Sequence, residues 1–126
     1  MKTQEELKRQ RLDSATLCQF TGTEHYYRIS RKVVITDGAR HLAEYGQAYW
    51  MMDAIGSHLL EIGTIDWFIL VRVCVDQGRA LMIYEDGNGN ELARQSIPYS
   101  DFALESITLY ACWDGNHWVI MLPSEY

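Results

Sequence analysis

Few residues in this chain have the types and spacing that chemistry requires, and the first two are Asp53 and Asp37. Asp53 is a single carboxylate in the otherwise apolar run of residues 48–60. If that run forms a buried helix, an unpaired charge inside it is costly, so Asp53 either serves a ligand or pairs with a structural partner. Asp37 lies four residues before His41, so the two can share one helix face. Asp37 can equally cap the start of that helix without any chemical role.

The remaining candidate groups form no catalytic or metal-binding signature. Asp86, Asn88 and Asn90 match the first three ligand positions of a calcium loop, but Glu91 and Ile97 occupy the positions that need Gly and Glu. A β-turn explains the same residues. The four histidines lack zinc-type spacing, and the cysteines at 18, 74 and 112 form no CxxC pair. We therefore expect no catalytic residue, no metal and no cofactor, with Cys74 and Cys112 in the core.

Charge and composition narrow the classes of partner. The chain has 126 residues, one domain's length, and a net charge of −6. Residues 41–126 hold three basic and twelve acidic residues, whereas residues 1–40 carry a net +3. An acidic net charge does not favour nucleic-acid binding, and a local basic patch within residues 1–40 remains an alternative. An odd number of unpaired cysteines, a polar start and the absence of a long apolar run predict a cytoplasmic protein that does not enter a membrane.

Hydrophobic periodicity predicts helices before strands. Residues 1–12 are expected to form a flexible or frayed arm, and residues 13–126 a single domain. Short helices are predicted at 15–20 and 39–45, a short strand at 32–35, and a central buried helix at 47–60. After Gly63 the period changes to two, which predicts strands to the end of the chain. The expected fold is α+β, with the N-terminal helices packed on one face of an antiparallel meander sheet of about five strands.

The predicted helices and strands suggest where a ligand would bind. The space between helix 47–60 and the sheet is the expected ligand site. Its candidate residues combine carboxylates, aromatic rings and one guanidinium: Asp37, Tyr49, Trp50, Asp53 and Arg28. The aromatic residues can equally belong to the core.

A succession of short motifs resembles a known family. The run FTGTEHYYR at residues 20–28 is followed by TDG at 36–38, HLAE at 41–44, AYWMMDAI at 48–55 and a closing SEY at 124–126. Together they resemble an uncharacterised bacterial family, a domain of unknown function, over residues 14–126. The resemblance implies an intracellular single-domain protein and no known activity, cofactor or catalytic residue. It singles out TDG, Tyr49, Trp50 and Asp53 as signature positions.

Three functional hypotheses follow from these observations. The first is a small cytoplasmic protein-interaction or binding module without catalytic activity, whose partner is a second copy of the chain or another protein. Open sheet edges would serve such pairing. The second is a small-molecule-binding protein or enzyme that uses the expected ligand site. The third is an acidic regulator that docks on a basic protein through the acidic half of the chain.

Overall fold

A mixed seven-stranded sheet and the helices packed against it form the protein. The computed structural model describes residues 14–100, 102 and 104–126. The predicted arm at residues 1–12 lies outside the described residues. The elements follow the chain as α2 (Ser14–Leu17), β1 (Tyr26–Ser30), β2 (Val33–Thr36), α3 (Asp37–Tyr45), α4 (Tyr49–Ile62), β3 (Phe68–Asp76), β4 (Arg79–Asp86), β5 (Glu91–Ile97), β6 (Ser106–Trp113), β7 (Trp118–Met121) and the 3₁₀ turn η1 (Pro123–Glu125).

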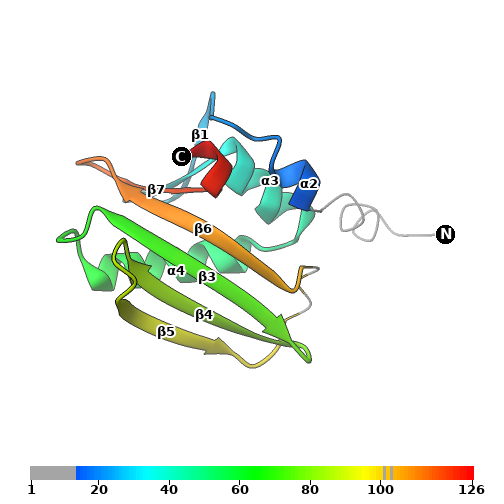
Figure 1. The fold of residues 1–126 in the computed structure, drawn as a ribbon. Helices are drawn as coiled ribbons and strands as arrows, with labels where there is room; N and C mark the ends of the chain where they lie inside the picture. Colours follow the sequence, from blue (N-terminus) through cyan, green and yellow to red (C-terminus); the bar gives the residue numbers. More distant parts are fainter. Residues whose placement is uncertain (1–13, 101, 103) are drawn as a thin grey trace.

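The sheet confirms the α+β class but corrects its topology. Its strand order is β1-β2-β7-β6-β3-β4-β5 (Figure 1). The expected antiparallel meander of about five strands was wrong in two respects. Strand β1 extends the sheet beyond β2, and β2 pairs with β7 in parallel. Helices α3 and α4 lie between strands β2 and β3 in the chain, so they form a crossover instead of preceding all the strands.

Strand alternation explains which face of the sheet is covered. In β3 the side chains of Ile69, Val71 and Val73 are buried, and the intervening Arg72 and Cys74 are exposed. Neighbouring strands repeat this pattern, because successive side chains point to opposite faces. Figure 1 shows α4 crossing behind β3 and β4, while the opposite face has no helix over these strands. One face therefore carries the core and the other is the uncovered face.

Helix α4 packs on the sheet through one side only. Met51, Met52, Ile55 and Leu59 are fully buried. The exposed residues follow at helical spacing on the opposite side: Tyr49, Asp53, Ser57, Leu60 and Glu61. The expectation of an all-round buried helix was therefore wrong, and so was the expected burial of Asp53. A helix that covers one face of a sheet meets solvent on its other side, whatever its mean hydropathy.

Two smaller predictions met different outcomes. Cys74 is exposed on the uncovered face and Cys112 is half-buried, so the expectation that both thiols lie in the core was wrong.

The Asp86 loop joins β4 to β5 as a turn. Its carboxylate accepts hydrogen bonds from the backbone N–H groups of Asn88 and Asn90 at 2.8 and 2.9 Å. These bonds explain the turn without a bound cation.

Candidate functional site

The N-terminus of α3 is joined to the last residues of the chain. Thr36 is the cap residue, and its Oγ1 accepts a hydrogen bond from Ala39 N at 3.2 Å. Glu125 accepts bonds from Thr36 Oγ1 at 2.6 Å and from Gly38 N at 3.0 Å. A Cβ on Gly38 would collide with the Glu125 carboxylate and lie 2.7 Å from Leu122 Cδ1. The TDG and SEY motifs thus meet in one structural contact.

Asp37 holds the preceding loop instead of capping the helix. Its Oδ2 accepts a hydrogen bond from Glu24 N at 2.9 Å, and its Oδ1 accepts one from the Tyr27 hydroxyl at 3.0 Å. The Asp37 backbone N–H in turn donates to Thr23 Oγ1 at 2.9 Å. The Glu24 N–H, followed by the Tyr27 and Thr23 hydroxyls, keeps the pKa of Asp37 below its ordinary value despite partial desolvation. This carboxylate therefore fixes the loop at one end of α3.

Three rings pack against one another beside α3, at tilted angles. The His41 ring centroid lies 5.1 Å from that of Phe20 and 4.3 Å from that of Tyr45. His41 is half-buried, but its Nε2 atom is fully buried and has no hydrogen-bond partner among the residues that the structure describes. Burial lowers the pKa of His41 from 6.5, so the imidazole is neutral at pH 7. An unpaired buried nitrogen is unusual in a folded protein, so this histidine requires an explanation.

Helix α3 also carries charged side chains of both signs, Arg40 and Glu44. The Arg40 guanidinium lies 4.4 Å from the centre of the Tyr27 ring, in cation–π geometry. Glu44 accepts a hydrogen bond from the Tyr49 hydroxyl at 3.4 Å. Tyr27 thus contacts Asp37 through its hydroxyl and Arg40 through its ring face, which positions both groups.

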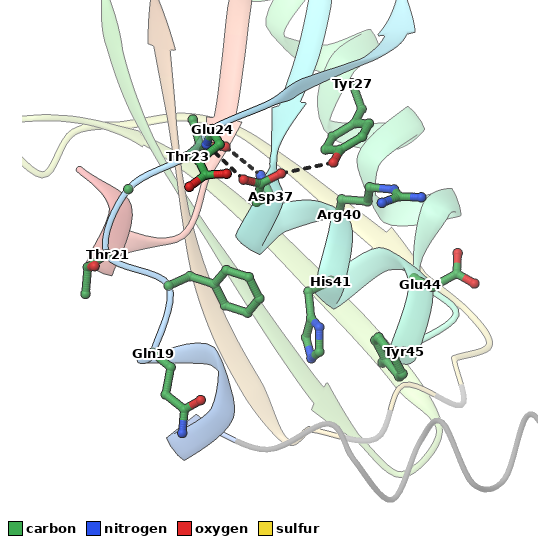
Figure 2. Close-up of a pocket in the computed structure, with 12 residues that line it drawn as sticks. Gln19, Thr21, Thr23, Glu24, Tyr27, Asp37, Arg40, His41, Glu44 and Tyr45 are labelled. Atoms are coloured by element: carbon green, nitrogen blue, oxygen red, sulfur yellow. Dashed lines mark hydrogen bonds between the residues drawn. The ribbon is translucent and has the colours of Figure 1, made fainter.

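These groups line a cavity of about 820 Å³ between residues 19–24 and α3. Figure 2 shows the loop on one side of the cavity and the α3 side chains on the other. Its volume lies within the range of small-molecule sites. The wall combines aromatic rings, hydroxyls and charges: Gln19, Phe20, Thr21, Gly22, Thr23, Glu24, Tyr27, Asp37, Arg40, His41, Glu44 and Tyr45.

The structure separates the five residues predicted for the ligand site. Asp37 lines this cavity, and Tyr49 adjoins it through Glu44. Trp50 packs against the core, and Asp53 is exposed on α4; neither lines the cavity. Arg28 is exposed and follows Tyr27 in β1, so it points to the opposite side of the strand. The cavity lies beside α3 and not between α4 and the sheet.

Sequence reasoning missed most of the cavity wall. It weighed His41 and Glu44 only as metal ligands, it named Tyr45 only within a general set of aromatic residues for a pocket, an interface or the core, and it assigned Phe20 and Arg40 to no site. The helical spacing of residues 37, 40, 41, 44 and 45 was the available signal, because i, i+3 and i+4 side chains share a face. The contribution of Phe20 had no such signal, since a loop packs it against α3.

Across residues 14–100, 102 and 104–126, no three His, Cys, Asp or Glu side chains are grouped so that they could hold a metal ion. No helix in this described part of the chain has the length and apolar character needed to cross a membrane.

Comparisons with known proteins give the fold and the family. No curated protein matches the chain. Among solved structures, it is similar to a protein of unknown function from Enterococcus faecalis, with a TM-score of 0.57 and 18% sequence identity over 81% of this chain and 98% of that one. At this identity the similarity shows the fold alone. A model of DUF6876, a family of unknown function, matches residues 11–126; the chain therefore belongs to this uncharacterised family, as its motifs predicted.

Proposed function

We propose that this protein is a binding module whose ligand is a small zwitterion, held in the cavity between residues 19–24 and α3. The observation that carries the proposal is the wall itself. It places Arg40, Glu24 and Glu44 around the same cavity as His41, whose buried Nε2 lacks a partner among the described residues. Convergent polar groups in a cavity of this size are typical of ligand sites.

The charges favour a ligand with both an ammonium and a carboxylate. Arg40 offers planar donors that suit a carboxylate. Glu24 is exposed at the opposite side of the cavity and suits an ammonium group. Asp37 has both oxygens engaged by the loop and Tyr27, so its role is to hold the loop in place.

The rings supply the apolar part of the site. Phe20 and Tyr45 pack against His41, which itself lines the cavity. A ligand that reaches Nε2 would provide the missing hydrogen bond. Burying that nitrogen without a partner costs about 1–3 kcal/mol. Ligand binding would offset this cost, so an unpaired Nε2 in the free protein is consistent with a binding role for His41.

The experiment is a saturation-transfer NMR titration with the free amino acids as probes. Binding of at least one amino acid, and its loss in His41→Phe and Arg40→Gln, would support the proposal. His58→Phe is the matched control, because His58 also stacks on a tyrosine, 4.8 Å from Tyr84, but has its Nδ1 bonded to the Ala54 carbonyl. Absence of saturable binding for every amino acid would overturn the zwitterion site.

A second candidate function is pairing with another protein, including a second copy of the chain. The observation that favours it is that β1 and β5 are the edge strands of the sheet, and Tyr26 on β1 is 60% exposed. Native mass spectrometry separates the two functions. A monomer with added mass supports the cavity, and a bare dimer supports edge pairing.

A further inference from the structure

A second cavity, of about 410 Å³, lies where β3 begins on the uncovered face. Four aromatic side chains contribute to its wall: Trp67, Phe68, Tyr110 and Tyr126. Phe68 and Tyr110 project from β3 and β6 on the side opposite the helices. Asp66 completes the wall with the only charged side chain among the described lining residues. None of these residues belongs to the cavity beside α3.

The rings stand at steep angles to one another. Phe68 and Tyr110 have centroids 4.9 Å apart and planes at 63°. Tyr126 lies 5.5 Å from Phe68 at 72° and 5.7 Å from Tyr110 at 89°. At these distances the rings pack edge to face, so their faces have different orientations around the cavity.

Exposed rings around this cavity are held in place by backbone and side-chain bonds. Trp67 is 58% exposed and Tyr126 is 68% exposed. The Trp67 carbonyl accepts a hydrogen bond from Trp113 N at 2.8 Å, which fixes the backbone that carries the indole. Tyr126 follows Glu125, whose carboxylate is bound at the N-terminus of α3. Large apolar surfaces held in water around a hollow are typical of binding sites.

The electrostatics favour a cation. Aromatic ring faces are electron-rich and attract ammonium groups, most strongly in water-excluded cages. Asp66 adds a negative charge beside the rings. Residues 41–126, which supply every residue of this wall, contain three basic and twelve acidic residues. An anion or a nucleotide phosphate would meet no compensating charge here.

We propose that the aromatic cavity formed by Trp67, Phe68, Tyr110 and Tyr126, with Asp66, binds a methylated ammonium group. The group is the same on a choline-type small molecule and on a trimethylated lysine side chain, so the chemistry is shared by both sources. This site is independent of the proposed zwitterion site, because the two cavities share no lining residue.

The test is an NMR titration with choline and with 3,3-dimethylbutan-1-ol, its uncharged isostere. Choline is expected to bind with upfield shifts of its methyl protons and to perturb the Trp67 indole N–H signal. The isostere is expected to bind about three- to tenfold more weakly, as cation–π contacts of this size predict. Titration with Nα-acetyl-trimethyllysine methylamide then distinguishes the sources, since tighter binding than choline would indicate a peptide ligand and weaker binding a free one.

Matched variants locate the binding. Tyr126→Leu should weaken choline binding several-fold, whereas Tyr126→Phe should retain it. Tyr99→Leu is the control, because Tyr99 is similarly exposed, at 76%, but lies outside the cavity. Asp66→Asn is a second, conservative variant and should also weaken choline without affecting the isostere.

Three results would overturn the inference. Equal affinity for choline and its isostere would show an apolar site without cation selectivity. Equal loss from Tyr99→Leu and Tyr126→Leu would place the binding elsewhere. No saturable binding of choline or of trimethyllysine would show that the rings only pack the end of the chain onto the sheet. Each result leaves the amino-acid titration of the other cavity unaffected.

Discussion

Replacing His41 by phenylalanine should stabilise the free protein, which is the opposite of what most buried substitutions do. The phenyl ring can occupy the same place between Phe20 and Tyr45, and it removes a buried nitrogen that has no partner in the described part of the chain. Leaving such an atom unpaired costs about 1–3 kcal/mol. Because the ring as a whole is only half-buried and phenyl is larger than imidazole, we expect a gain near the lower limit. About 1 kcal/mol corresponds to a rise in Tm of roughly 4 °C for a domain of this size.

Acidification should enlarge this difference. Burial lowers the pKa of His41 in the folded protein below its ordinary value of 6.5, so the folded state holds the neutral imidazole. The unfolded state then binds more protons as the pH falls, and the stability present above pH 6.5 is lost as the pH falls through the folded pKa. His41→Phe removes this dependence, so the gap between variant and wild type should widen from pH 7.5 to pH 5.5.

The assay is urea and thermal unfolding followed by circular dichroism at pH 7.5, 6.5 and 5.5. His58→Phe is the control, because it loses a 3.0 Å hydrogen bond from Nδ1 to the Ala54 carbonyl and should show no gain. The reasoning is refuted if His41→Phe destabilises the protein as much as His58→Phe, since Nε2 would then have a partner in solution. If His41→Phe is more stable than the wild type but binds amino acids equally well, the stability argument holds. Only the proposed role of His41 in ligand binding is then refuted.

Five further substitutions test other parts of the structure. Gly38→Ala should lower the free energy of unfolding in urea by more than about 1 kcal/mol, because the added Cβ has no room. Gly56→Ala is the control and should be neutral or stabilising, because a Cβ at Gly56 would lie 3.4 Å from Val33 Cγ2. Glu125→Ala should cost about 2 kcal/mol and relieve part of the Gly38→Ala penalty in a double-mutant cycle. The Glu24 N–H holds the pKa of Asp37 below 3.8, so the stability that the carboxylate contributes is present above that pH and is lost as the pH falls through the lowered pKa; the protection factor of the Glu24 amide in hydrogen exchange should therefore fall on acidification, and in Asp37→Asn it should be reduced without this pH dependence. Asp53→Asn should leave Tm unchanged because the side chain is exposed, and a clear loss would reveal a partner.

Local patterns in the sequence correctly predicted many of the elements. The change to a period of two after Gly63 predicted strands that the structure confirms, from Phe68 to Met121. Thr36 and Asp37 predicted the start of a helix, and Thr36 is indeed its cap. These features depend on neighbours two to four residues apart, so they can be recognised in the sequence without the tertiary structure.

The tertiary structure alone decided what those elements contact. Glu125 meets Gly38 although 87 residues separate them, and β2 pairs with β7 in parallel. No pattern within either segment encodes these pairings, because they depend on which long-range contacts bury the most surface together. The burial of individual side chains also depends on tertiary packing. Helix α4 is apolar by composition, yet only the side that meets the sheet is buried, so Asp53 lies in solvent while His41 is enclosed by Phe20. The sequence determined most of the segments that form helices and strands, although not β1, whereas packing determined which of their side chains line a site.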